Sequence, residues 1–323
     1  MDFQYTEDQE ALVSALQSIL QDHAEMPQAE RFSYSYFSAA LQGILTDSGF
    51  LDAGHQIGAL EAALVVAETA KLPVLVEASA TGLVAPMVLP GEKLEGPVAL
   101  VDVRKLDKAH RNLTIARTVL VDMGEDVAIL PVEAGQVEPV KSIYGYPYGR
   151  FATTPDLASA RHLRGQGAAL RQWWRVAIAI EIAAASMAAI DFTVDYVKQR
   201  HVFGKPIGAF QAVQHRLVQC KAFAMATHYL AMRAAWSGEP GHADFAACHA
   251  QQGIQKLLFD LHQFHGGMGV TTEHLLHFWT YRVRALQAEA GGVYATAIDI
   301  AGRLWSDTAP PIDVSADTRV RVA

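Results

Sequence analysis

The sequence predicts an α+β fold that is mostly helical and divided into three regions and a tail. In residues 1–95 apolar residues recur at helical spacing, which predicts an N-terminal helical domain. Residues 96–163 contain short β-branched runs between turn residues, which predicts a small β domain. Residues 164–305 are rich in alanine and predict long helices, and residues 306–323 predict a tail. A chain of 323 residues is long enough for more than one domain.

The N-terminal region begins with a helix-start signal. Thr6 and Gln9 have the spacing of a capping box, in which each side chain accepts a hydrogen bond from the other residue's backbone. One apolar helical face follows, formed by Leu12, Leu16, Ile19 and Leu20. Further helices are predicted over residues 37–45 and 59–70, with Pro73 and Pro90 as breakers. Residues 77–82 are expected to form a loop between helices.

The middle region changes to β character. Strands are predicted over residues 98–103, 113–116, 118–121 and 126–130, because each is a short β-branched run next to turn residues.

Composition excludes several classes of function. The net charge is −8, and before Gly96 there are three basic residues against 14 acidic ones, so nucleic acid is a poor partner. No run of about 18 apolar residues predicts a transmembrane helix. The first residues have neither a basic nor an apolar segment, so we expect no signal peptide and a cytoplasmic location. Cys220 and Cys248 lie in helical sequence, which favours reduced thiols over a disulfide.

Two ordered motifs point to a nucleotide cofactor. Residues 200–211 have the pattern R-x-x-F-G-x-x-I-x-x-F-Q, and residues 263–273 have the pattern Q-x-x-G-G-x-G-x-x-x-E. An arginine guanidinium can fork onto phosphate oxygens, and glycines let the backbone approach a ligand closely. Taken singly, each of these residues could simply end a helix or lie in a loop. The two motifs together, in this order along the chain, favour a cofactor site.

These two motifs resemble those of the acyl-CoA dehydrogenase family. The resemblance implies FAD bound across a subunit interface. It implies that Arg200 pairs with the pyrophosphate, Phe203 packs on the FAD and Gln211 bonds the adenine side. It further implies that Gln263 and the backbone of Gly266 and Gly267 close the adenosine pocket of a neighbouring subunit.

The resemblance also implies an acyl-CoA dehydrogenase-like fold with an N-terminal helical domain, a middle β domain and a C-terminal four-helix bundle. Here the middle domain is shortened. It lacks the T-E-P-x-x-G-S-D-like segment and the loop that bind the flavin ring in full-length members. The half-site for this chain's own isoalloxazine ring is therefore expected to be deleted.

Both positions at which the family places its catalytic glutamate lack a carboxylate in this sequence. Those positions are occupied by Trp174 and Ala290, and Gly292 replaces a threonine of the Y-E-G-T turn. Glu289 lies one residue away and is expected to be an exposed turn or N-cap carboxylate. No catalytic residue is therefore assigned to this chain.

Two rival interpretations concern histidine and tryptophan. The spacing of His262, His265, His274 and His277 could present imidazoles to zinc, but no cysteine or cluster of carboxylates completes the ligand set, so we expect no metal site. Trp173 and Trp174 could stack on a ligand, but large aromatic residues in a helical bundle are more often core or interface.

The resemblance leads to a functional expectation. We expect a shortened subunit of an α2β2 acyl-CoA dehydrogenase, of the type known from steroid side-chain degradation, an oxidoreductase of lipid metabolism related to β-oxidation. This chain would supply the adenosine and pyrophosphate half of the FAD site, while a second acyl-CoA dehydrogenase subunit supplies the catalytic glutamate. The other partners would be an acyl-CoA substrate and an electron-transfer acceptor. Two alternatives stay open: a self-sufficient homo-oligomer that uses Glu289, and a non-catalytic scaffold.

Overall fold

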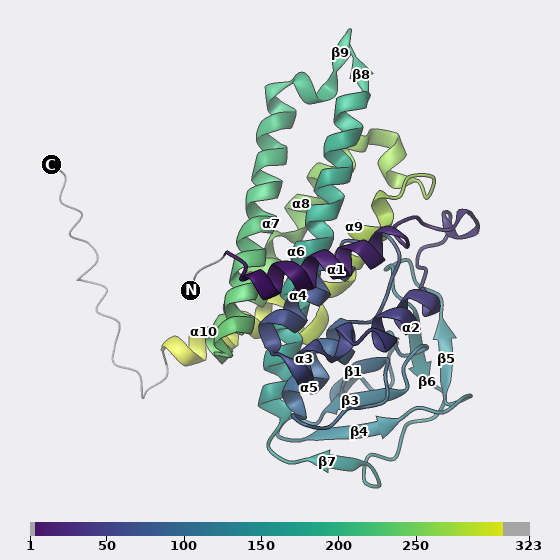
Figure 1. Ribbon diagram of the computed structural model, residues 1–323, viewed down its shortest axis with the longest axis vertical. Coiled ribbons are helices and arrows are strands. Elements are labelled where there is room, and N and C mark those ends of the chain that lie inside the picture. Colours follow the sequence, from purple (N-terminus) through teal and green to yellow (C-terminus); the bar gives the residue numbers. More distant parts are fainter. Residues whose placement is uncertain (1–3, 306–323) are drawn as a thin grey trace, which may run out of the picture.

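A computed structural model describes residues 4–305, and the expected tail of residues 306–323 lies outside them. One long helix, α6 (Gly167–Gln199), runs through the molecule (Figure 1). The N-terminal helices and the β region lie around its first part, and a small hairpin lies at its far end (Figure 1). The division at residues 95 and 163 remains a prediction.

The N-terminal helices are α1 (Glu7–Gln21), α2 (Ala39–Asp47), α3 (Ala53–Gln56), α4 (Ala59–Ala70) and α5 (Ala85–Val88), with 3-10 turns at Gln28–Glu30 and Phe50–Asp52. The capping box is confirmed, because Thr6 Oγ1 accepts from Gln9 N–H at 3.3 Å and Gln9 Oε1 accepts from Thr6 N–H at 3.1 Å. The helix predicted over residues 59–70 is confirmed, and α2 starts two residues later than predicted.

The predicted loop over residues 77–82 was wrong in part. Ser79–Val84 forms a π-helical turn, η3, that leads directly into α5. The buried carboxylate of Glu77 organises this turn, because it accepts from the backbone N–H of Ala80 at 2.7 Å and of Thr81 at 2.9 Å. A carboxylate at the start of a helix satisfies backbone donors that have no intrahelical partner.

The β region contains two sheets. The larger has the order β1 (Val98–Asp102), β3 (Thr118–Asp122), β4 (Val127–Pro131) and β7 (Arg161–Leu163), with β1 and β3 parallel and the other pairs antiparallel. The smaller has the order β2 (His110–Arg111), β6 (Tyr148–Phe151) and β5 (Val137–Val140), all antiparallel. A 3-10 turn at Val103–Lys105 follows β1.

The strand predicted over residues 113–116 was wrong. This segment is a turn, because the N–H groups of Ile115 and Ala116 donate to the carbonyls three residues earlier, those of Asn112 and Leu113. Asn112 has φ +63°, a conformation that asparagine tolerates better than most residues. Leu113 is fully buried in the core of the β region, so its apolar character reflects packing and not a strand.

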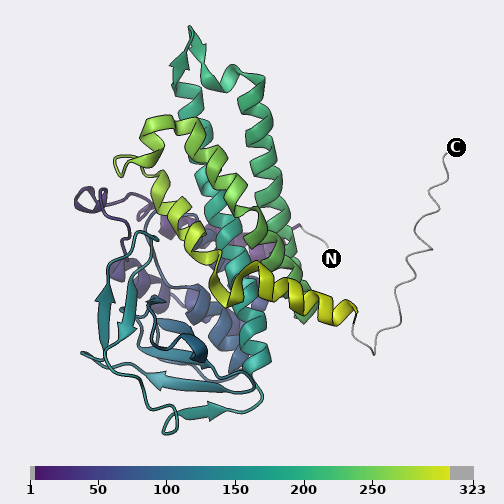
Figure 2. The same cartoon turned by 180° about the vertical axis from the view of Figure 1, so that it is seen from behind.

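The C-terminal bundle contains α6, α7 (Gln211–Ser237), α8 (Pro240–His265), α9 (Leu276–Leu286) and α10 (Gly292–Leu304). The hairpin of β8 (His201–Val202) and β9 (Lys205–Pro206) and a 3-10 turn at Ile207–Ala209 connect α6 to α7. Further 3-10 turns, η6 (Gly266–Val270) and η7 (Glu289–Gly291), flank α9. Seen from behind, α8, α9 and α10 lie on the face opposite the N-terminal helices (Figure 2).

Helix α6 is buried along most of its length. By length and composition alone it is apolar enough to cross a membrane, but 78% of that apolar window is buried inside the protein, which is typical of a core helix. Cys220 and Cys248 lie on α7 and α8 as free thiols.

Ion pairs, one of them buried, tie α6, α8 and α10 together. The Arg175 guanidinium contacts Asp244 at 2.6 Å and Asp299 at 2.5 Å, and Arg303 Nε contacts the other oxygen of Asp244 at 2.8 Å. Arg175 and Asp244 are both nearly inaccessible to solvent. Removing one partner of a buried pair leaves an uncompensated buried charge.

We expect Asp244→Ala to lower the free energy of unfolding by about 3 kcal/mol, because the buried Arg175 loses its buried partner. Urea denaturation would measure it. The matched control is Asp195→Ala, which breaks an exposed pair with Lys198 and should cost about 0.5 kcal/mol or less. Equal losses in the two variants would contradict a special role for the buried pair.

Candidate functional site

The first motif lies at the exposed end of α6. Arg200 caps the helix, and its side chain makes no ion pair or hydrogen bond with residues 4–305. Phe203 occupies the hairpin tip with its side chain 92% exposed and φ +54°. Gln211 begins α7 and is also exposed. A strained, solvent-exposed aromatic residue costs free energy in the isolated chain, which indicates a surface shaped for a ligand or partner.

The second motif ends α8 near the same end of the bundle. Gln263, Gly266 and Gly267 are exposed, and Gly266 has φ +58°, which favours glycine. His265 stacks on Tyr196 of α6 with the ring centroids 4.3 Å apart. Since Tyr196 lies one turn before Arg200, this contact fixes the second motif relative to the end of α6 that bears the first.

An open groove of about 660 Å³ adjoins the second motif. Gln263 and Gly266 line it together with Phe259, Tyr281 and Arg284. Arg200, Phe203, Gln211 and Gly267 do not line this groove. The structure therefore places the six predicted FAD residues in two exposed groups and not around one cavity of this chain.

The two positions of the family's catalytic glutamate lie close together. Trp174, on α6, is buried, as expected for a core aromatic residue, and its indole Nε1 donates to Glu289 Oε2 at 3.1 Å. Ala290 has φ +49° within the turn η7, directly after Glu289. Trp173 is buried as well, so the core interpretation of both tryptophans is confirmed.

A buried cluster around Arg111 occupies this location. The guanidinium Nη1 contacts both carboxylate oxygens of Glu181 at 3.0 and 2.8 Å, and Nε contacts Glu289 Oε1 at 2.8 Å. The Tyr146 ring lies against the same guanidinium, 4.7 Å from ring centroid to Cζ. Glu289 was therefore wrongly predicted to be an exposed carboxylate, because its side chain is 16% exposed and engaged by Arg111 and Trp174.

The cluster perturbs the ionisation of its members. Burial opposes the charge on Arg111, but Glu181 and Glu289 overcome it and hold the pKa of the guanidinium well above its usual value. Burial raises the pKa of Glu181, and Arg111 opposes that shift. One cation is thus shared by two carboxylates. A general base must lie within hydrogen-bond reach of the proton that it removes. Both carboxylate oxygens of Glu289 instead contact Arg111 and Trp174 of this chain.

Sequence reasoning missed Arg111 and Glu181. They lie 70 residues apart, on β2 and α6, and no local pattern joins them. The one available signal was a glutamate within an otherwise apolar stretch of a core helix, since a buried carboxylate requires a partner.

The histidines in and around the second motif make hydrogen bonds to other parts of the protein. His262 bonds the Gly269 carbonyl oxygen at 2.6 Å and Thr280 Oγ1 at 3.1 Å, and His265 bonds Thr193 Oγ1 at 3.0 Å. His277 bonds two carbonyl oxygens, of His274 at 2.7 Å and of Ser33 at 2.8 Å. No group of three or more potential metal ligands occurs within residues 4–305.

The site residues fit FAD unequally. The groove beside Gln263 offers aromatic faces, an amide and a cation, which suits an adenosine phosphate. In contrast, Arg111, Tyr146 and Trp174 fill the interior between the β region and α6 at the family's base positions, where the neighbouring cavity holds only about 10 Å³. The chain therefore has an open groove beside Gln263 and a filled interior beside Trp174.

Comparisons with known proteins agree with this fold. Residues 169–304 match the family model described as acyl-CoA dehydrogenase, C-terminal domain. Acyl-CoA dehydrogenase IpdE2 of Mycobacterium tuberculosis (strain H37Rv) is 31% identical over 107 residues, which are 33% of this chain and 34% of that protein. The match thus spans about a third of that relative.

Two solved structures are similar over nearly the whole chain. The ChsE4-ChsE5 complex from Mycobacterium tuberculosis has a TM-score of 0.77 and 20% identity, covering 96% of this chain and 100% of the compared one. The Tcur3481-Tcur3483 steroid ACAD has a TM-score of 0.75 and 22% identity, covering 91% and 97%. Residues 169–304 therefore match the acyl-CoA dehydrogenase C-terminal domain, and the chain has the fold of these two solved structures.

Proposed function

We propose that this chain is the non-catalytic subunit of a flavin-dependent acyl-CoA dehydrogenase. It would supply the adenosine and pyrophosphate half of the FAD site to a partner subunit, and the partner would supply the flavin-ring contacts and the catalytic glutamate. When bound, FAD accepts a hydride from the β carbon of an acyl thioester while a base removes the α proton. We place the assembly in the cytoplasm, with a separate electron-transfer acceptor.

The arrangement around Glu289 is the observation that supports this proposal best. Trp174 and Ala290 occupy the two base positions, and the adjacent Glu289 is bound by Arg111 at 2.8 Å and by Trp174 at 3.1 Å. Both oxygens of the Glu289 carboxylate thus contact groups of this chain itself, Oε1 the Arg111 guanidinium and Oε2 the Trp174 indole. The geometry thus disfavours the self-sufficient alternative.

The exposed groups at the far end of α6 support the second part of the proposal. Arg200 has no partner within residues 4–305, and Phe203 is almost fully exposed on a strained turn. A pure scaffold gives no reason for an unpaired arginine and a strained aromatic residue at the end of α6, or for the open groove at Gln263. A cofactor held between two subunits would account for all three features.

The two-subunit assembly and the substrate class rest on similarity. One solved relative of the same fold is a complex of two proteins, ChsE4 and ChsE5, and another is described as a steroid ACAD. We infer an α2β2 assembly and a bulky substrate such as a steroid side-chain CoA thioester, since a second active site filled by Arg111 and Tyr146 leaves one site for each pair of subunits.

Flavin content separates the three candidate functions. We expect the chain purified alone to be colourless, because it lacks contacts for the flavin ring, and the complex with a co-expressed partner to be yellow. Visible absorbance spectra would measure both. Stoichiometric flavin on the chain alone would support the self-sufficient alternative, and a colourless complex would support the scaffold.

We expect Arg200→Ala to weaken FAD binding by the complex about ten- to a hundredfold, because hydrogen bonds to charged groups contribute about 1.5–3 kcal/mol. Arg200→Lys should rescue binding only in part, because an ammonium keeps the positive charge but cannot make the bidentate contact of a guanidinium. FAD titration of the apo-complex measures the affinity. Arg233→Ala, at another exposed arginine on α7, is the matched control and should bind normally. Unchanged affinity in Arg200→Ala would exclude the half-site.

We expect Glu289→Gln to leave turnover of the complex within about tenfold of wild type, because the base belongs to the partner. A loss beyond about a hundredfold, the lower end of what a general base contributes, would assign catalysis to Glu289. Steady-state kinetics measures turnover, and a melting curve accounts for the weakened contact with Arg111. Glu138→Gln, which weakens an exposed pair with Arg150, is the control.

A further inference from the structure

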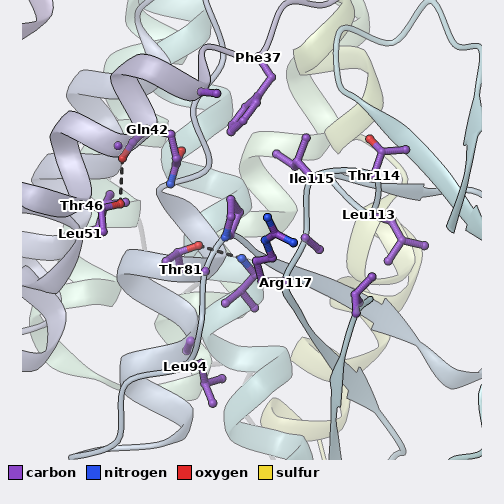
Figure 3. A pocket seen from close by; sticks show the side chains of 18 of the residues that line it. Phe37, Gln42, Thr46, Leu51, Thr81, Leu94, Leu113, Thr114, Ile115 and Arg117 are labelled. Carbon is purple, nitrogen blue, oxygen red and sulfur yellow. Dashed lines mark hydrogen bonds between the residues drawn. The ribbon is translucent and has the colours of Figure 1, made fainter. Parts of the chain in front are cut away.

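A second cavity lies between the N-terminal helices and the β region, away from the predicted FAD residues. It holds about 660 Å³, the size of a typical small-molecule site. Its walls come from α2, the 3-10 turn Phe50–Asp52, η3, the start of β1 and the turn of residues 113–117 (Figure 3). The apolar side chains that line it include Phe37, Leu51, Leu94, Leu113 and Ile115.

Three uncharged polar groups in this cavity are satisfied by the protein itself. The Gln42 amide bonds both the N–H and the carbonyl of Glu77, at 2.7 and 3.0 Å. The Thr46 hydroxyl donates to the Gln42 carbonyl at 2.8 Å, and Thr81 Oγ1 accepts from Val98 N–H at 3.0 Å (Figure 3). These side chains therefore present hydrocarbon more than free hydrogen-bonding groups to the cavity.

Arg117 is an unpaired cation at this cavity. Its backbone is fixed by hydrogen bonds of 2.8 Å to Pro97 and to Val132, and its side chain points into the cavity (Figure 3). Within residues 4–305 the guanidinium has no ion pair, whereas Lys93, the other cation of the lining, is paired with Asp52 at 2.8 Å. Two exposed carboxylates, Asp47 and Glu133, also line the cavity and would repel a ligand with more than one negative charge.

We propose that this cavity binds a small monocarboxylate with an apolar body, whose carboxylate pairs with Arg117 and whose body packs against the partly exposed side chains of Phe37, Leu94 and Ile115. The walls favour an apolar body because burial of apolar surface stabilises the complex. A single anionic group fits the one unpaired guanidinium. The site is independent of the FAD half-site, since the two share no residue.

Calorimetric titration with octanoate, and with 1-octanol as its neutral analogue, tests the role of charge. The full chain should bind both. Arg117→Gln should weaken octanoate binding about three- to fivefold, because an exposed charge pair contributes only a small free energy. The same variant should leave octanol binding unchanged. Arg164→Gln, at another exposed arginine without a partner in the described residues, is the control and should bind both normally. Equal octanoate affinity in Arg117→Gln and wild type would overturn the proposal.

A second variant tests the cavity without risk to the fold. Gly43 lines the cavity on α2, and an added Cβ meets no atom within 4 Å, so Gly43→Leu should fill the space and favour the helix. It should abolish detectable binding of octanoate and octanol with no fall in melting temperature. Gly241→Leu, at an equally open helical glycine on α8, is the matched control. Unchanged binding by Gly43→Leu, or no octanoate binding by the wild-type chain, would overturn the proposal.

Discussion

The structure depends on one guanidinium held between two carboxylates in the interior. Arg111 comes from β2, Glu181 from the middle of α6 and Glu289 from the turn before α10, so the contact joins the β region to both parts of the bundle. A buried ion pair adds little net stability compared with a well-packed apolar core, but the loss of one partner is costly. The cluster therefore fixes the relative positions of these elements more than it strengthens the fold.

The same cluster explains how the two ends of α6 differ. Near Glu181 and Trp174 the helix is enclosed by the β region and the turn at Glu289. At Arg200 it ends in an exposed hairpin whose tip residue, Phe203, packs against nothing in the bundle. Helix α6 has 33 residues and is about 50 Å long at 1.5 Å per residue. One of its ends is enclosed by the protein, and the other is exposed to solvent. A partner subunit can thus use the open end without access to the closed one.

Local sequence signals predicted the parts of the fold that local physics determines. The capping box at Thr6 and the helix of residues 59–70 depend on neighbours in the chain, and both were predicted correctly. The turn of residues 113–116 was mistaken for a strand because Leu113 and Ile115 look the same in a buried turn and in a β-strand. The helical turn after Glu77 was missed because the capping carboxylate precedes an unusual π turn.

The residues of the candidate site also divide into those that a local motif identifies and those that depend on contacts between distant parts of the chain. The motif residues Arg200, Gln263 and Gly266 could be named from the sequence because each motif is contiguous, although their role stays a prediction. The state of Glu289 could not, because its partner Arg111 is 178 positions away in the chain. The turn conformation does not determine whether Glu289 is exposed or buried either, since a carboxylate next to Ala290 could point to solvent or inward.

The absence of a carboxylate at Trp174 and Ala290 need not loosen the fold around them. If Trp174 and Ala290 merely replaced a glutamate, the empty site would leave a cavity or a hydrated pocket, and each lost contact would cost stability. Instead the Trp174 indole, the Tyr146 ring and the Arg111 guanidinium fill the space, and every carboxylate in it has a donor. A large, fully satisfied cluster is specific in its geometry, because no smaller set of partners satisfies all of its groups. That specificity keeps the β region in register with α6, and through α6 it keeps the exposed hairpin in the orientation that a partner would meet.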